Sequence, residues 1–382
     1  MRYICTRCKQ TSPDGHLWCQ EIDCPAGTLP ALLNFGDYLG NIAIVRLLRV
    51  TRTAAIYVAE RGKDRFLLKV ANYGYTDYLR HEGELLKILA SRQVVHPALP
   101  TLCPPELDSS DPCGVSVFRG ETRHYLLLGY FEGQFLSDVL LDNPEPWHYD
   151  VGWFMLTLAQ AIDCIHKNAE RLHLNLHPDG ILVYRNSANI MQPYLVDLGL
   201  CVEPYQNILP DLMQNIQRNV PPSYAAPEMF SVGSVLTPGT DVHGLGILYY
   251  EMLAGSPAFA YRLRKETDIR QAVKVSMPAP LKRPDLPGGR KNNHKPPDDQ
   301  TASSVVICIE MATHRNPSQR YQTVNEFREA VHAIYHDVPE KRRFALSQRA
   351  RLVLVAVLAV IVLVIVLLVI LSLTTAVGRG SF

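Results

Sequence analysis

The chain has 382 residues, of which 47% are hydrophobic and 20% are charged, and its 38 basic and 37 acidic side chains nearly cancel. This length allows one sizeable core with appended segments. The balanced charge selects neither nucleic acid nor an acidic partner, so the net charge by itself is uninformative about partners. No apolar run of signal-peptide type lies between Met1 and Cys24. We therefore expect the bulk of the chain to be cytoplasmic, with its cysteines reduced.

Two cysteine pairs lie close together near the N-terminus, Cys5 with Cys8 and Cys19 with Cys24. Four thiolates can bind one tetrahedral zinc ion, and metal binding supplies folding free energy that so short a segment cannot obtain from an apolar core. A redox CxxC motif and unrelated buried cysteines are the alternatives. The spacing predicts a zinc-ribbon-like module over residues 1–34 with one structural zinc ion. Acidic residues oppose the basic ones in this module, so no nucleic acid is expected as a partner.

The next region changes from strand periodicity to helix periodicity. Strand-length apolar runs occupy residues 42–48, 54–60 and 65–71, and residues 125–130 form another. Helical spacing is found in residues 79–89, 153–166, 241–253 and 324–335. The pattern predicts a small β-rich lobe followed by a larger helical lobe.

Several short motifs follow one another in a fixed order. They comprise residues 66–69 (FLLK), 80–82 (RHE), 126–130 (LLLGY), 173–180 (HLNLHPDG), 196–199 (VDLG), 224–228 (YAAPE), 240–246 (TDVHGLG) and 316–321 (NPSQRY). In this order the segments resemble the protein kinase family, and the resemblance extends from about Gly40 to His336. It implies an α+β, bilobal protein-kinase-like fold over residues 35–337.

The resemblance also implies roles for individual residues. Lys69 stands where the family has the lysine that binds the nucleotide phosphates, and Glu82 stands where its helical ion-pair partner is found. Leu128 and Tyr130 lie in the segment that resembles the hinge of the nucleotide site. Asp197 matches the magnesium-binding aspartate. Two fold-maintaining features are also expected, a loop-holding aspartate at Asp241 and an arginine at Arg320 that pairs with Glu228.

The residues needed for phosphoryl transfer are only partly present. The stretch that matches the phosphate loop, residues 49–57, contains no glycine, so close approach of its backbone to a nucleotide is compromised. Asn175 occupies the position of the usual aspartate base, and an amide cannot take up the substrate proton. Gly180 replaces the second metal ligand and offers no side-chain oxygen.

These losses predict a pseudokinase that acts as a signalling or scaffold protein and binds ATP weakly or not at all. The alternative is an active but unconventional Ser/Thr kinase that transfers the γ-phosphate of ATP to protein. Two interpretations of Lys69 and Asp197 also stay open, a weak site for ATP and magnesium or a structural ion pair between the lobes. In either case we expect a protein partner or substrate.

An uninterrupted apolar run of about 20 residues begins at Leu352, and as a helix it would span roughly 30 Å, the thickness of a hydrocarbon core. A buried core helix is the alternative, but such helices are rarely apolar on every face. Five basic residues precede the run: Lys341, Arg342, Arg343, Arg349 and Arg351. The positive-inside rule therefore predicts a basic juxtamembrane segment (338–351), a single transmembrane helix (352–372) and a short tail (373–382) on the side opposite the cytoplasmic domains.

Overall fold

The computed structural model describes residues 3–4, 11–12, 32–103, 110–142, 146–187, 189–259, 266–281 and 297–335. All of them belong to one compact unit, Met1–Asp337. The predicted zinc ligands Cys5, Cys8, Cys19 and Cys24 lie outside the described residues, as do the predicted segments 338–351, 352–372 and 373–382. Within the described ranges, no helix is both long enough and apolar enough to cross a membrane.

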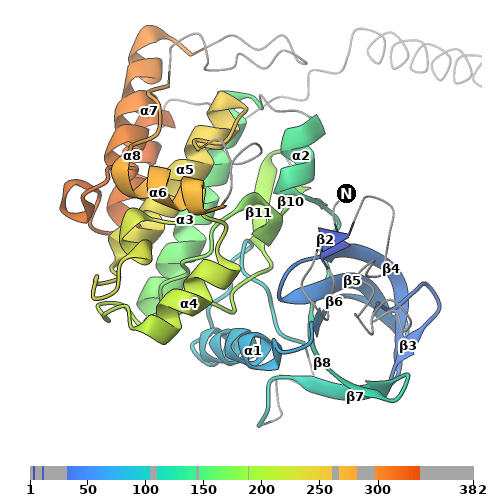
Figure 1. The fold of residues 1–382 in the computed structure, drawn as a ribbon. Helices are drawn as coiled ribbons and strands as arrows, with labels where there is room; N and C mark the ends of the chain where they lie inside the picture. Colours follow the sequence, from blue (N-terminus) through green and yellow to red (C-terminus); the bar gives the residue numbers. More distant parts are fainter. Residues whose placement is uncertain are drawn as a thin grey trace, which may run out of the picture. The chain divides into compact units, whose positions relative to one another are not determined.

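A six-stranded antiparallel sheet forms the first lobe (Figure 1). Its strands, in spatial order, are β3 (Tyr38–Leu39), β4 (Ile42–Val50), β5 (Ala54–Arg61), β6 (Asp64–Ala71), β8 (Glu121–Gly129) and β7 (Gly114–Phe118). The strands predicted from periodicity correspond to β4, β5, β6 and the second half of β8. A separate ladder joins β1 (Tyr3–Ile4) to β2 (Thr11–Ser12).

The two faces of this sheet have different surroundings. One face carries the apolar core of the lobe, which includes Tyr57, Leu68 and Leu127, and Leu32 and Leu33 pack into the same core. Side chains alternate along a strand, so Lys69 on β6 points to the other face. There it lies opposite Leu126 of β8, and helix α1 (Thr76–Ser91) packs beside β8 (Figure 1).

The second lobe is built around helix α5. The helices of this lobe are α2 (Leu136–Asp142), α3 (His148–Ala169), α4 (Pro210–Asn219), α5 (Pro238–Ala254), α6 (Glu266–Val275), α7 (Asp299–Ala312) and α8 (Val324–Tyr335). Every residue of α5 from Gly239 to Leu253 is buried, because α3, α7 and α8 pack around it. The helix begins at Pro238, whose fixed φ suits a first turn, and it ends before Gly255 in the left-handed conformation.

The second lobe also contains a small three-stranded sheet. Its strands are β9 (Gln134–Phe135), β10 (Ile181–Arg185) and β11 (Met191–Leu195), in the order β11-β10-β9. A single 3₁₀ turn, Pro178–Gly180, directly precedes β10. The sheet therefore places the loop that ends at Gly180 beside the segment that follows β11, and the predicted two-lobe arrangement is confirmed.

Candidate functional site

A buried lysine lies between two carboxylates where the lobes meet. The Nζ atom of Lys69 is 2.5 Å from Oε2 of Glu82 and 3.3 Å from Oδ1 of Asp197, and it donates to the carbonyl oxygen of Val196 at 2.8 Å. Lys69 is 1% exposed and Glu82 is completely buried. An ammonium group has three N–H donors, so Lys69 uses all of them within the protein. A bound phosphate would have to displace one of these acceptors.

Burial and neighbouring charges set the protonation of this group. Desolvation alone would lower the pKa of Lys69, but the carboxylates of Glu82 and Asp197 outweigh it, and the pKa is raised. Burial raises the pKa of Glu82 to about 7, against the lowering effect of Lys69. Lys69 is therefore a cation, and for Glu82 the cost of burial opposes the effect of the paired ammonium group.

Asn175 lies beside Asp197 and binds it. Its Nδ2 atom donates to Oδ2 of Asp197 at 3.0 Å and lies 3.5 Å from the hydroxyl of Tyr78. Because Lys69 contacts the other oxygen, both carboxylate oxygens of Asp197 already accept a bond from the protein. The amide of Asn175 has no basic site for a substrate proton, and its Nδ2 group is occupied as a donor to Asp197.

Tyr78 of α1 completes the buried network. A Cβ atom added to Gly199 would collide with the Tyr78 ring, so a glycine at this position allows the helix to approach the segment that follows Asp197. Burial, followed by the nearby carboxylate of Asp197, raises the pKa of the Tyr78 phenol well above its ordinary value. The motifs of the sequence did not indicate this role for Tyr78.

Asp241 of α5 holds the loop that carries Asn175. Its Oδ2 accepts a bond from the backbone N–H of His173, and its Oδ1 accepts one from that of Leu174, both at 2.7 Å. The Nε2 atom of His166 also lies 2.7 Å from Oδ2. Leu174 has a φ of 62°, a left-handed conformation that costs a residue with a Cβ atom roughly 1–2 kcal/mol. Asp241 therefore offsets backbone strain in this loop, in the role that the resemblance implied.

Arg49 bridges the two lobes at the mouth of the site. Its Nη2 atom lies 2.5 Å from Oδ2 of Asp138 on α2, and its Nη1 atom lies 2.5 Å from Oδ1 of Asp179. The guanidinium also stacks over Phe135, with Cζ 4.3 Å from the ring centroid. The strand register shifts between Leu47 and Arg49, and irregularities of this kind re-aim a side chain.

The described residues do not fit a site for two magnesium ions. Gly180 offers no side-chain oxygen, and the carboxylate of Asp179 accepts bonds from Arg49 and Ser137. Asp197 alone would supply a single carboxylate. Across the described ranges, no group of three His, Cys, Asp or Glu side chains is arranged to hold a metal ion. The ligand set that phosphoryl transfer ordinarily uses is therefore incomplete here.

The two predicted hinge residues have different positions. Leu128 lies opposite Leu67 in the sheet and is 1% exposed. Leu67 is two residues before Lys69 on β6, so Leu128 and Lys69 lie on the same face of the sheet. Tyr130 follows the end of β8 and lies beside the exposed Arg65. The structure thus brings together Lys69, Glu82, Asn175 and Asp197, places Leu128 on the same face, and leaves Tyr130 apart.

A groove of about 550 Å³ runs from the turn between β4 and β5 down to α6. Its walls include that turn (residues 49–53), residues of α2, the loop residues 177–179 and the segment 217–224. Asp197 also lines the groove. The groove is large enough for an extended segment of protein chain or a small ligand.

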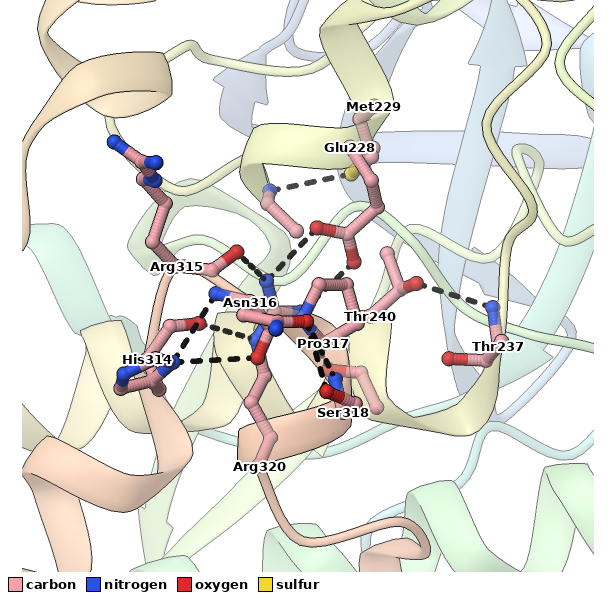
Figure 2. Close-up of polar contacts among 12 residues, drawn as sticks. Glu228, Met229, Thr237, Thr240, His314, Arg315, Asn316, Pro317, Ser318 and Arg320 are labelled. Carbon is pink, nitrogen blue, oxygen red and sulfur yellow. Dashed lines mark hydrogen bonds and ion pairs between the residues drawn. The ribbon is translucent and has the colours of Figure 1, made fainter.

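A buried ion pair holds the segment after α4. Arg320 donates from Nη1 and Nη2 to the two carboxylate oxygens of Glu228, each at 2.8 Å, as the dashed lines in Figure 2 show. Its Nη1 also donates to the carbonyl oxygen of Gly239 at the start of α5. The Arg320 side chain is fully buried. This is the pair that the resemblance implied.

Sequence reasoning did not find the contacts of Arg49. The only signal was an arginine in a stretch where the resemblance calls for glycine. The acceptors Asp138 and Ser137 belong to no motif, and the side-chain contacts of Asp179 could not be inferred from its position in the chain. Their joint role depends on how the two lobes pack.

Comparison with known proteins agrees with this geometry. The family model described as the protein kinase domain matches residues 114–336. The chain is 26% identical over 240 residues to the human serine/threonine-protein kinase DCLK3, an alignment that covers 62% of this chain and 32% of that protein. It is 27% identical over 201 residues to the serine/threonine-protein kinase PknE of Mycobacterium tuberculosis (52% and 31%). It is 24% identical over 223 residues to the probable serine/threonine-protein kinase CPE1738 of Clostridium perfringens (57% and 29%).

These alignments span about a third of the length of each relative. The family match covers more than half of this chain and includes the loop held by Asp241 and the Glu228–Arg320 pair. The chain belongs to the protein kinase domain family.

Proposed function

We propose that this chain is a pseudokinase whose kinase-family domain works as a binding and signalling module with weak or no ATP binding. The observation that carries the proposal is the contact between Asn175 and Asp197. An amide donor lies at the position of the usual base and bonds Oδ2 of Asp197 at 3.0 Å, while Lys69 contacts the other oxygen. The carboxylate that would bind magnesium is thus satisfied by protein donors.

The chemistry of phosphoryl transfer supports this proposal. A positioned general base contributes about 100- to 10,000-fold to the rate, and Asn175 cannot supply it. Lys69 has no N–H left for a phosphate unless it gives up Glu82, Val196 or Asp197. Arg49 carries a long side chain where the family has a glycine that lets the backbone approach the nucleotide.

Phosphoryl transfer by the purified full-length chain is the direct test, measured with labelled ATP and magnesium or manganese. Lys69→Ala and Asp197→Ala serve as controls. We expect no transfer above that of the two controls. Transfer at ordinary kinase rates, about 1 to 100 per second, abolished in both controls, would contradict the proposal.

That result would support the second candidate, an active but unconventional Ser/Thr protein kinase that uses ATP and magnesium. The observation in its favour is the intact Lys69–Glu82 pair at 2.5 Å, with Asp197 on the same ammonium group. A catalytic arrangement that had lost all function would not be expected to keep a completely buried carboxylate paired with a lysine, because burying these charges is costly.

The sequence supports three further parts of the proposal. Cys5, Cys8, Cys19 and Cys24 bind one structural zinc ion, the segment 352–372 anchors the chain in a membrane with the other domains cytoplasmic, and the kinase-family domain binds a protein partner. Metal analysis of the full-length chain should give about one equivalent of zinc, lost when the four cysteines are replaced by serine. A metal-free, folded N-terminal module would refute the zinc site. Recovery of the chain in the soluble fraction of lysed cells would refute the anchor.

A further inference from the structure

An apolar surface lies outside the groove, where two segments of the second lobe pair through their backbones. Tyr205 donates from its backbone N–H to the carbonyl oxygen of Leu236 at 2.7 Å, and Leu236 donates to that of Gln206 at 3.1 Å. Ile208 continues this ladder by donating to the carbonyl oxygen of Ser234 at 2.8 Å. The side chains of Ile208 and Leu236 are completely buried, so one face of the ladder packs against the lobe.

The opposite face of the ladder carries exposed apolar side chains. Asn207 pairs with Val235 in an antiparallel bridge, and side chains alternate along a strand, so Val235 and Leu209 lie on the face opposite to Ile208. Four apolar residues of the two segments are 43–70% exposed: Tyr205, Leu209, Val232 and Val235. We call these four residues the ladder patch, and none of them lines the groove. Single exposed apolar residues are common, but several on one short ladder indicate an interaction site.

Tyr205 has a backbone conformation that suits glycine better than tyrosine. Its φ is 62°, in the left-handed region, where Cβ crowds the following carbonyl oxygen. The side chain is 70% exposed, so little packing offsets this strain. A glycine at this position would remove the strain and keep the backbone bond to Leu236. The fold therefore gives no reason for a tyrosine here, whereas tyrosine is enriched among the residues that dominate binding between proteins.

Leu209 is also a poor choice for the stability of the fold. It is the N-cap of α4, where Ser, Thr, Asp or Asn would accept a hydrogen bond from the first turn, and its side chain makes no such bond. The leucine side chain is also 65% exposed. Residues that break a local rule without a gain in packing are expected at functional sites. Two members of the ladder patch thus favour binding at the expense of stability.

Acidic side chains border the ladder patch. Glu203 and Asp211 are the only charged residues within 203–211 and 231–237. Asp211 is exposed in the first turn of α4, and the side chain of Glu203 is 70% exposed although it pairs with Arg171 at 3.3 Å. Complementary charge guides and orients a partner, so lysine or arginine suits this border. A second copy of the chain does not, because a two-fold contact brings the same acidic border against itself.

We propose that the ladder patch binds a segment of a partner protein in which apolar side chains stand next to lysine or arginine. The apolar side chains cover Tyr205 and Leu209, and the basic side chains lie beside Asp211. Asn207 is exposed between the members of the patch, and its amide can both donate and accept hydrogen bonds to the backbone of the partner. The inference rests on the proposed role of the domain as a binding module.

The test selects peptides from a random library displayed on phage, with the purified full-length chain as the target. Selection is repeated on Tyr205→Gly, and a peptide enriched only on the unaltered chain is synthesised with a fluorescent label. Fluorescence anisotropy gives its affinity for the unaltered chain, Tyr205→Gly, Leu209→Ser, Asp211→Asn and a matched control, Tyr73→Gly. Tyr73 is a tyrosine of the first lobe that is 65% exposed. The thermal unfolding of every variant is measured in parallel.

We expect the enriched peptides to combine apolar and basic residues. Tyr205→Gly and Leu209→Ser should each weaken binding by roughly 10-fold or more, whereas Tyr73→Gly should leave it unchanged. Asp211→Asn should weaken binding by about 2- to 5-fold and reduce its dependence on salt. The unfolding temperatures of Tyr205→Gly and Leu209→Ser should equal or exceed that of the unaltered chain, because glycine removes strain and serine caps α4.

Three results would overturn the proposal. Enrichment of acidic peptides, no enrichment, or equal affinity for Tyr205→Gly, Leu209→Ser and Tyr73→Gly would show that the site is wrong. Lower unfolding temperatures of both Tyr205→Gly and Leu209→Ser would show that these residues serve the fold instead. Self-association of the unaltered chain in sedimentation, lost in both variants, would identify a second copy as the occupant in place of a partner protein.

This experiment does not involve phosphoryl transfer. An active domain would overturn the pseudokinase proposal without altering these affinities, and binding that does not depend on the ladder patch would leave the pseudokinase proposal intact.

Discussion

Replacing Arg49 by alanine should loosen the contact between the two lobes. The guanidinium group makes ionic contacts with Asp138 and Asp179, whose side chains are 34% and 50% exposed, and Arg49 itself is 12% exposed. Solvent screening limits each contact to about 0.5–1 kcal/mol, and stacking on Phe135 adds about 0.5–1 kcal/mol. The free energy of unfolding should fall by about 2 kcal/mol.

Urea unfolding measures this change, and hydrogen exchange locates it. Amides of β4 and α2 should exchange faster in Arg49→Ala than in the unaltered chain, because the contacts between these elements are lost. Arg49→Lys should give an intermediate result, since lysine keeps the charge but lacks the planar fork that reaches both carboxylates. Removal of the side chain should also strengthen binding of an ATP analogue, because the arginine occupies the mouth of the cleft.

Two controls test whether Arg49 connects the lobes. Arg46 lies on the same strand but is exposed, so Arg46→Ala should change the free energy of unfolding by less than about 0.5 kcal/mol. A double-mutant cycle with Asp138→Asn should give a coupling energy of about 0.5–1 kcal/mol. Equal effects of Arg49→Ala and Arg46→Ala, together with zero coupling to Asp138, would show that Arg49 does not connect the lobes.

Three further changes test the buried charges. Arg320→Ala leaves the buried carboxylate of Glu228 unpaired and should lower the free energy of unfolding, measured by urea titration, by about 3–5 kcal/mol. A loss below about 1 kcal/mol is typical of an exposed ion pair and would contradict the burial of this one. Burial lowers the pKa of His173 from 6.5 to about 4, so folding favours the neutral ring. The free energy of unfolding should therefore be highest above pH 6.5 and should fall by about 3 kcal/mol as the pH is lowered toward 4. Flat stability over that range would refute this. Asn175→Asp places a second carboxylate beside Asp197 and should lower the free energy of unfolding by up to about 4 kcal/mol. Added magnesium should partly restore the unfolding temperature. An unchanged unfolding temperature without magnesium would refute the contact between the two side chains.

Much of the fold could be predicted because its signals are local. Apolar alternation indicated β4, β5 and β6, and helical spacing indicated the cores of α1, α3, α5 and α8. The helices α2, α4 and α6 are short, and the periodicity did not identify them individually. Their formation depends on the lobe against which each one packs.

Some residues of the candidate site could likewise be predicted from the sequence, and others could not. Lys69, Glu82 and Asp197 could be identified from motifs in a fixed order, since each motif contains both the reactive residue and its local context. The sequence also identified the lost base at Asn175. Only the structure showed that the Asn175 amide bonds Asp197, because this contact depends on the loop that Asp241 holds.

The sequence by itself determined the two-lobe plan, the family resemblance and the missing catalytic groups, because periodicity and motif order are properties of neighbouring residues. Only the tertiary structure showed that the side chain of Arg49 lies between the two lobes. Arg49 contacts Asp138 and Asp179, which are 89 and 130 residues away in the chain, and a shift in strand register directs it there. Contacts over such separations depend on how the lobes pack, and no local pattern in the sequence records that packing.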